Sequence, residues 1–297
     1  MKKERSVRTN ISLWVFLLAA IFAATACADT FVTNWDLQSV APDGTPNNPM
    51  LGTLEKVIIE GIALNNPEDM LDLSSQWQVF VEGEGGDLGG TAAWAGNFYY
   101  LEGQEAWDNE VVRLNSSGFR QGDRIRITGY VGQVNGKANF NERHSGASSM
   151  DFAIELLESG VGLPTPELTT IPEMNVFDPA RLTGGERYQC RRIRIDGVHV
   201  VSGTWGPNEN LTVADDSGNE IPMRLCNVGF GPMPLGKFSV IGLGNQEGEM
   251  GNPDIGLIDG YQVWVTQANG IIAIPEPLGL TVMAGGIFLM FLRRNRK

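Results

Sequence analysis

A series of short runs rich in valine, isoleucine and threonine occurs twice along this chain, in the same order. The runs correspond in pairs: 56–64 with 191–200, 77–81 with 211–214, 90–94 with 221–225, 122–129 with 236–242, and 151–157 with 261–266. Runs of this length between turn-forming residues are typical of β-strands. The first run of each series contains a glycine, Gly61 or Gly197, at a corresponding point, which predicts a bulge where the strand bends. The sequence therefore predicts an all-β protein of two similar units with five strands each.

Five strands in this order, with a bent first strand and a fourth strand that starts at a glycine, resemble the OB-fold, a small β-barrel. The resemblance implies two tandem barrels, at 50–160 and 186–270. A lead segment at 29–49 precedes them, and the proline-rich stretch 161–185 is typical of a linker. The same number of strands also fits a two-sheet sandwich. No long stretch keeps an apolar period of 3.6 residues, so helix is expected to be a minor component.

The first 28 residues have the layout of a secretory signal peptide. Four basic residues within the first eight precede an apolar stretch at 11–24, and small residues follow as far as Ala28. This layout predicts export through the Sec machinery and removal of residues 1–28.

The C-terminal segment 271–297 contains three parts in this order: a Pro-Glu-Pro triplet, an apolar run at 278–292 and a basic cluster. The residues of the triplet and the cluster are Pro275, Glu276, Pro277, Arg293, Arg294, Arg296 and Lys297. This order resembles the PEP-CTERM sorting signal of Gram-negative bacteria, which an exosortase recognises and cleaves. As a helix, the apolar run spans about 22 Å, less than the roughly 30 Å of a hydrocarbon core. The basic cluster stays on the cytoplasmic side by the positive-inside rule.

The resemblance implies partners and a location as well. The partners are the Sec machinery and an exosortase-type membrane protease. The protein then passes through the inner membrane, held by a hydrophobic C-terminal helix, to the cell surface or extracellular matrix of a Gram-negative-type bacterium. Systems of this kind are associated with exopolysaccharide. A permanent single-pass anchor is the alternative interpretation of the same tail.

The charge of the exported body is strongly negative. The whole chain has a formal net charge of −13, with 22 basic and 35 acidic residues. Without residues 1–28 and 293–297, 14 basic and 34 acidic residues remain, a net charge of −20. Nucleic acid is therefore disfavoured as a bulk ligand, since its non-specific binding depends on basic side chains that neutralise phosphates.

Most of the remaining basic residues fall in two windows, at 113–143 and 181–194. Four of them alternate with isoleucines: Arg124, Arg126, Arg192 and Arg194. Alternation on a strand predicts that these arginines project from one face while the isoleucines point inward. One interpretation is a local anion site, for an acidic polysaccharide or for nucleic acid. The other is structural: the arginines pair with neighbouring acids across strands or pack between the two units.

Aromatic residues form a second candidate ligand-binding set. Its members are Trp94, Phe98, Tyr99, Tyr100 and Trp107 in the first unit and Trp205 in the predicted first loop of the second unit. Flat rings beside polar groups suit sugar faces or nucleobases. The alternative is that these rings fill the barrel mouth or the gap between the two units, because aromatic side chains dominate core burial.

Motifs for catalysis are missing from the sequence. His144 and His199 are the only histidines, and neither belongs to a His-Glu-x-x-His helix. There is no Gly-x-Ser-x-Gly elbow. We therefore expect no catalytic residue, no metal site and no cofactor. The alternative, which the many carboxylates allow, is a catalytic pair of the kind that glycosidases use.

Cysteine usage is compatible with export but does not decide the redox state. Cys190 and Cys226 are the two cysteines that remain after the signal peptide is removed. In a disulfide-permissive compartment they either form a bridge or stay as separate buried thiols.

The sequence as a whole favours a non-enzymatic, exported surface or matrix protein that contacts exopolysaccharide. An extracellular nucleic-acid-binding OB-fold protein is the first alternative, and a secreted hydrolase is the second.

Overall fold

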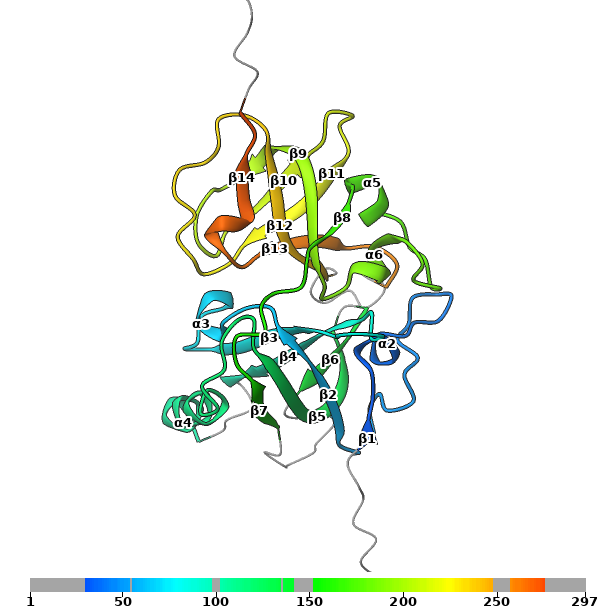
Figure 1. Ribbon diagram of the computed structural model, residues 1–297, viewed down its shortest axis with the longest axis vertical. Coiled ribbons are helices and arrows are strands. Elements are labelled where there is room, and N and C mark those ends of the chain that lie inside the picture. Colours follow the sequence, from blue (N-terminus) through cyan, green and yellow to red (C-terminus); the bar gives the residue numbers. More distant parts are fainter. Residues whose placement is uncertain are drawn as a thin grey trace, which may run out of the picture.

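The computed structural model describes residues 30–53, 55–97, 102–134, 136–141, 152–247 and 257–275. Two closed five-stranded barrels follow one another along the long axis of the molecule (Figure 1). Among the described residues no helix is long and apolar enough to cross a membrane. The expected signal peptide and the apolar run at 278–292 lie outside these residues.

The first barrel closes in the order β2-β3-β4-β6-β5 and back to β2. The barrel strands are β2 (Val57–Ala63), β3 (Gln76–Glu82), β4 (Gly90–Gly96), β5 (Arg124–Val134) and β6 (Lys137–Asn141). Neighbouring strands are antiparallel except β4 and β6, which are parallel. Two further strands lie outside the ring: β1 (Thr30–Phe31) pairs with β2, and β7 (Ala153–Glu158) pairs with β5.

The second barrel repeats this ring in the order β9-β10-β11-β13-β12. Its strands are β9 (Arg192–Gly203), β10 (Asn210–Ala214), β11 (Glu220–Leu225), β12 (Phe238–Gln246) and β13 (Tyr261–Val265). The pair β11 and β13 is parallel, as the corresponding pair in the first barrel is. The short strands β8 (Glu167–Thr169) and β14 (Ile271–Ala273) extend the sheet at β9 and β12. Both units are thus OB-like barrels, which excludes the sandwich alternative.

One predicted strand has a different role from the one expected. The run 151–157 does form a strand, β7, but it lies outside the first ring, where it pairs with β5. The fifth barrel strand is β6, which pairs with β4 and β5. The short run of β6 directly follows the turn after β5, so the two form a hairpin, and this local pairing closes the ring.

The two glycines of the first strands serve different purposes. At Gly197 the φ angle is +74°, and the register between β9 and β12 shifts there, so the predicted bulge is confirmed. At Gly61 the register between β2 and β5 is continuous, so the bulge prediction is wrong. Instead, a Cβ atom at Gly61 would lie 2.3 Å from the carbonyl oxygen of Glu82, so the glycine permits close approach of β3.

Short helices join the strands, and one longer helix covers the first barrel. The short ones are α2 (Asn34–Leu37), α3 (Pro67–Met70), α5 (Ile171–Met174), α6 (Gly184–Tyr188) and η2 (Ala268–Gly270). Helix α4 (Gln104–Leu114) connects β4 to β5 and packs Trp107 and Leu114 into the first core. The second barrel has a non-helical loop at 226–237 in the corresponding place.

The alternation of β3 explains how the two barrels are joined. Trp77, Val79 and Val81 point into the core of the first barrel. Phe80, on the opposite face, belongs to a third apolar cluster shared by both barrels. Because both faces of β3 are covered, its apolar run is nearly continuous, as buried strands are.

The shared cluster brings distant parts of the chain into contact. It consists of Leu64, Met70, Leu71, Phe80, Ala92, Cys190, Cys226, Leu243 and Trp264. The rings of Phe80 and Trp264 meet edge to face, with centroids 5.9 Å apart. A Cβ atom at Gly90 would lie 2.2 Å from the carbonyl oxygen of Cys190, so the backbones of the two barrels touch there. The barrels are therefore packed against each other rather than strung on a free linker.

Polar contacts surround this shared cluster. The carboxylate of Glu82 accepts a hydrogen bond of 2.8 Å from the backbone N–H of Arg192, and the Arg191 guanidinium lies 3.4 Å from it. Lys137 Nζ donates to Asn245 Oδ1 at 2.5 Å. Burial raises the pKa of Glu82, although its hydrogen bonds and the charge of Arg191 act in the opposite direction.

Candidate functional site

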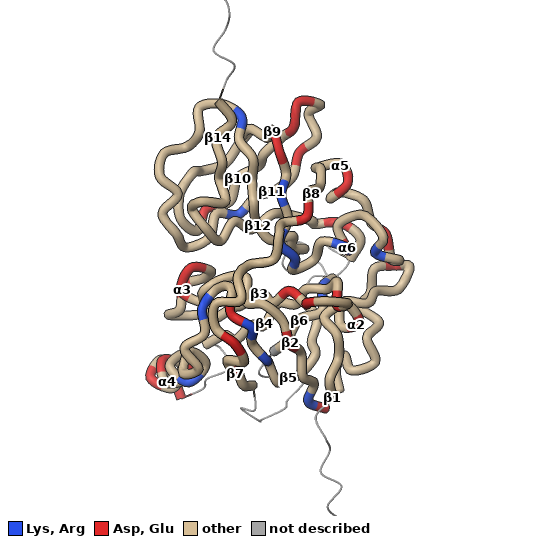
Figure 2. Tube along the Cα trace, in the orientation of Figure 1, with Lys and Arg blue, Asp and Glu red and all other residues tan. Residues whose placement is uncertain are grey.

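The two arginines of β5 that alternate with isoleucines are paired with acids from β2, from β7 and from the β3–β4 loop. Arg124 contacts Glu84 and Glu158, and Arg126 contacts Glu60 and Glu155. The hydrogen bonds to Glu84 raise the pKa of Arg124 above its ordinary value. Basic and acidic segments accordingly lie side by side around β5 and β7 (Figure 2).

The two arginines of β9 are also engaged. The Arg192 guanidinium donates to the carbonyl oxygen of Pro164 at 2.7 Å, and Arg194 Nε donates to Asp196 at 2.6 Å. Ile125, Ile127, Ile193 and Ile195 are buried, as the alternation predicts. Of the two interpretations of these arginines, the described structure shows cross-strand and local pairing.

The aromatic residues of the second candidate set are dispersed. Trp107 is fully buried in the first core, and its indole Nε1 donates to the carbonyl oxygen of Leu73 at 2.8 Å. Trp94 packs against the cluster shared by the two barrels. Trp205 lies in the loop after β9, beside Phe230 and Phe238. Phe98, Tyr99 and Tyr100 lie outside the described residues, so their contribution stays a prediction.

The histidines and the acidic residues do not form a metal site within the described residues. His199 is half-buried on β9, and His144 lies outside the described residues. The part of the chain that the structure describes holds no group of three or more His, Cys, Asp or Glu side chains that could bind a metal ion.

Cys190 and Cys226 are free thiols, both buried in the shared cluster. Burial raises the pKa of each thiol to about 12. Both thiols therefore stay protonated near neutral pH, and of the two interpretations of these cysteines the structure shows separate buried thiols.

A buried carboxylate lies at the base of the second barrel. Glu186 of α6 accepts a hydrogen bond of 2.8 Å from the Tyr261 hydroxyl and one of 2.9 Å from Gln189 Nε2. Burial raises the pKa of Glu186 to about 7, the hydrogen bonds only partly offsetting it. These contacts tie α6 to β13 and give the carboxylate a structural role.

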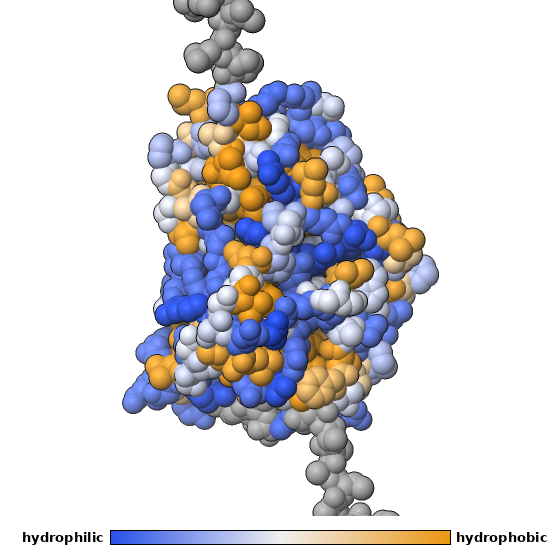
Figure 3. Space-filling model, in the orientation of Figure 1, coloured by the Kyte–Doolittle hydropathy of each residue, from blue (hydrophilic) through white to orange (hydrophobic). Residues whose placement is uncertain are grey.

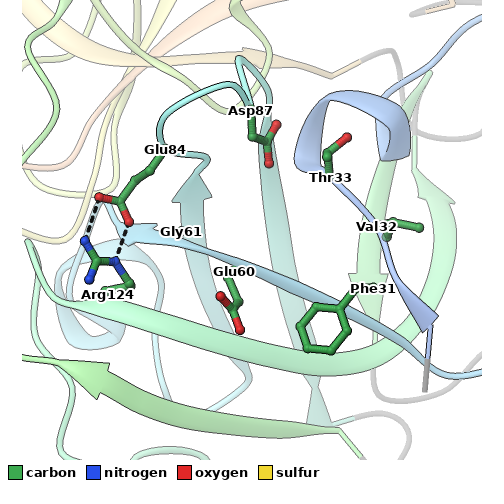
Figure 4. Close-up of a pocket in the computed structure, with 8 residues that line it drawn as sticks. All are labelled: Phe31, Val32, Thr33, Glu60, Gly61, Glu84, Asp87 and Arg124. Carbon is green, nitrogen blue, oxygen red and sulfur yellow. Dashed lines mark hydrogen bonds and ion pairs between the residues drawn. The ribbon is translucent and has the colours of Figure 1, made fainter. Parts of the chain in front are cut away.

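An open pocket of about 340 Å³ lies on the outer face of the first barrel (Figure 4). It is lined by Phe31, Val32, Thr33, Glu60, Gly61, Glu84, Asp87 and Arg124. These residues come from β1 and the start of α2, from β2, from the β3–β4 loop and from β5. Four separate segments thus build one concave surface.

The loop between β3 and β4 is held in place by Asp87. The Asp87 carboxylate accepts hydrogen bonds from the backbone N–H groups of Asn34, Trp35 and Gly89, at 2.7, 2.9 and 3.1 Å. A Cβ atom at Gly89 would lie 2.1 Å from the backbone nitrogen of Trp35. The glycine-rich stretch 83–90 thus positions one wall of the pocket.

Two side chains of the pocket are available to a ligand. Phe31 is 60% exposed, with the Arg126 guanidinium 5.5 Å from its ring centroid. Glu60 uses one oxygen, Oε1, to accept both hydrogen bonds from Arg126. Its other oxygen accepts no hydrogen bond within the described residues. In Figure 4 the Glu60 carboxylate and the Phe31 ring lie next to each other in the pocket.

The charge of the lining limits what the pocket can bind. Three carboxylates, from Glu60, Glu84 and Asp87, line the pocket with the Arg124 guanidinium, and the Arg126 guanidinium lies beside Phe31 and Glu60. The lining is net negative, so it repels anions and favours neutral or positively charged groups. An aromatic face beside carboxylate acceptors can pack against the apolar face of a sugar ring and accept hydrogen bonds from its hydroxyl or amino groups.

Sequence reasoning did not identify this pocket. Phe31 lies in the lead segment before the first predicted strand, while Glu60, Glu84 and Asp87 were counted only as part of the acidic total. The contacts that bring them together join residues more than 20 positions apart. The one local signal is the glycine-rich stretch 83–90, which marks the loop but not its neighbours.

Comparison with known proteins gives little beyond the fold. No protein-family model matches the chain, and no curated protein matches it either. Among solved structures, the chain is similar to one described as the tetrameric p202 HIN2. The identity is 9%, the alignment covers 80% of this chain and 94% of that chain, and the TM-score is 0.27. A likeness at this TM-score carries no conclusion about the function of this chain.

Proposed function

We propose that this chain is an exported, non-enzymatic surface or matrix protein that is released by an exosortase-type protease and binds exopolysaccharide. The observation that carries the proposal is the tripartite tail, with its Pro-Glu-Pro triplet, apolar run and basic cluster, together with a signal peptide at the other end. The net charge of the exported body also supports it, because a high negative charge keeps a secreted protein soluble.

The position of the tail in the fold is compatible with this proposal. The described chain ends at Pro275, directly after β14, at the pole of the second barrel that faces away from the first barrel (Figure 1). A tail that leaves from a pole can enter a membrane without disturbing either core. The triplet then follows the folded body directly, where a membrane protease can reach it.

The pocket on the first barrel supplies the polysaccharide-binding part of the proposal. Phe31 offers a ring for stacking, and the free oxygen of Glu60 offers an acceptor. Because the lining is net negative, we propose a neutral or amino sugar rather than the acidic polysaccharide that the arginine windows suggested. We do not propose nucleic acid, because acids already engage the described arginines of β5.

The sorting step is tested in the producing bacterium by cell fractionation and intact-mass analysis. We expect the exported form to have lost residues 1–28 and the apolar tail. Replacing Glu276 and Pro277 with alanine should leave the tail attached and the protein in the membrane fraction. A cytosolic chain with both ends intact would refute the proposal.

The binding step is tested with the purified body, residues 29–275, and the polysaccharide of the producing bacterium. We expect Phe31→Ala to weaken binding at least tenfold, while Val112→Ala, at an exposed position on α4, leaves it unchanged. Single-stranded DNA is the comparison ligand over a salt series. If the body bound DNA but not the polysaccharide, and its affinity for DNA fell steeply as salt rose, we would conclude that the ligand is nucleic acid. Hydrolysis of the polysaccharide would make the protein an enzyme.

A further inference from the structure

We propose that the free pole of the second barrel is a membrane-contact surface. It is formed by four apolar side chains, Met233, Leu235, Ile272 and Ile274, which we call the apolar rim. The inference rests on the proposed function, because the contact requires the C-terminal tail to be in the bilayer. It adds a role for the folded body, which the sorting signal does not provide.

All four rim residues expose their apolar side chains. Leu235 is fully exposed, and Met233, Ile272 and Ile274 are 39–46% exposed. Figure 3 shows hydrophobic residues at this pole, close to the point where the chain leaves the described region. Exposed apolar groups that gather in one place mark protein or membrane contacts, whereas scattered single residues need no explanation.

The rim residues are held on a structured base. Strand β14 pairs with the start of β12, and beyond that pairing the backbone N–H of Ile274 donates to the carbonyl oxygen of Lys237 at 2.9 Å. The loop at 226–237, which carries Met233 and Leu235, is fixed by Trp205, whose indole Nε1 donates to the carbonyl oxygen of Gly231 at 3.0 Å. Trp205 therefore supports this surface.

The length of the chain after β14 argues for the bilayer as the occupant. Two residues, Glu276 and Pro277, separate the described chain from the apolar run that starts at Leu278. Three steps between Cα atoms span at most about 11 Å. With the run at 278–292 inserted, the pole is therefore held at the headgroup region, where apolar side chains of a surface-bound element reach about 5–10 Å into the interface.

The charges beside the rim indicate what kind of contact this is. Lys237 lies next to it and pairs with the exposed Asp216, with Nζ and Oδ2 2.5 Å apart. A lysine can keep its ammonium group among the headgroups while its stem lies along apolar surface. Because the pair is nearly neutral overall, the contact depends on the apolar side chains. It should therefore persist at high salt, unlike a contact made by basic clusters.

The test uses the processed chain with its tail, residues 29–297, reconstituted in phosphatidylcholine–phosphatidylglycerol vesicles. Flotation with the vesicles reports insertion of the tail. A Leu235→Cys variant labelled with the fluorophore NBD reports contact of the rim, and a Val112→Cys variant on the first barrel is the matched control. The native thiols are buried and do not take the label.

We expect the label at position 235 to shift to shorter wavelength in vesicles and to be quenched by doxyl-labelled lipid, in 0.1 M and in 0.5 M salt. The label at position 112 should show neither effect. A second comparison uses the label at position 272, in an Ile272→Cys variant. Adding Met233→Ser and Leu235→Ser to this variant should leave its flotation unchanged but make the wavelength shift of its label smaller than in Ile272→Cys alone. Flotation without any shift at 235 would overturn the membrane-contact inference and leave the proposed function standing. Absence of flotation would overturn both.

Discussion

The contact between Phe80 and Trp264 leads to a prediction about how the protein unfolds. Phe80 is fully buried in the cluster shared by the barrels, with no part in either barrel core. We expect the intact body to unfold in a single transition, because this cluster couples the two barrels. In Phe80→Ala the coupling is weakened, so the barrels should separate into two transitions.

The size of the effect follows from the burial of the ring. Replacing a buried phenylalanine by alanine costs about 3–5 kcal/mol, which includes the cavity that is left behind. This is a large part of the roughly 5–15 kcal/mol that stabilises a typical protein. For a body of this size the loss corresponds to a fall in Tm of roughly 10 °C.

Scanning calorimetry of residues 29–275 measures this directly, because the ratio of the van't Hoff to the calorimetric enthalpy reports the number of cooperative units. Val79→Ala is a matched control, since Val79 lies on the other face of β3 and belongs to the core of the first barrel alone. It should lower the stability of the first barrel without uncoupling the two. Two separate transitions in the unmodified body, or a Phe80→Ala loss below about 1 kcal/mol, would refute the reasoning.

Two further predictions concern buried ionisable groups. The pKa of Glu186 is raised from 4.5 to about 7, so the folded state holds a proton that the unfolded state releases between these values. Stability should therefore fall by up to about 3 kcal/mol as pH rises from about 4.5 to above 7, and Glu186→Gln should flatten this slope in denaturant titrations. A slope that survives the substitution would contradict this assignment. Cys190 and Cys226 should resist the thiol reagent DTNB at pH 8 in the folded body and both react in guanidinium; fast reaction without denaturant would show that they are accessible.

Much of the strand order could be predicted from the sequence, because the short apolar runs are regular and bounded by turn residues. The main error concerns β6, whose five residues are fewer and more polar than those of the run at 151–157. Local pattern favours the longer run as a barrel strand, but hairpin geometry assigns that place to β6. Helix α4 was missed because its buried stripe has only a few residues, Trp107 and Leu114 among them.

The candidate site was less predictable than the fold, for a physical reason. Alternation with isoleucine correctly indicates that Arg124 and Arg126 project outward, but it says nothing about which acids face them. Those partners lie on β2, β7 and the β3–β4 loop. Only the pairing of β5 with β2 and β7, and the folding of that loop, brings them within reach. Phe31 is an extreme case, because a two-residue strand outside the barrel carries it into the pocket.

The shared cluster between the barrels has a mechanical consequence. The two barrels are packed together through Phe80, Trp264 and their neighbours, so the body transmits force along its length as one rigid unit. Two barrels joined only by a flexible linker would not. While the proposed C-terminal tail is still inserted, before cleavage, such a body would hold the β1 end, with Phe31, at a constant distance from the membrane. A polymer strand gripped there would be spaced from the membrane by the length of the protein itself.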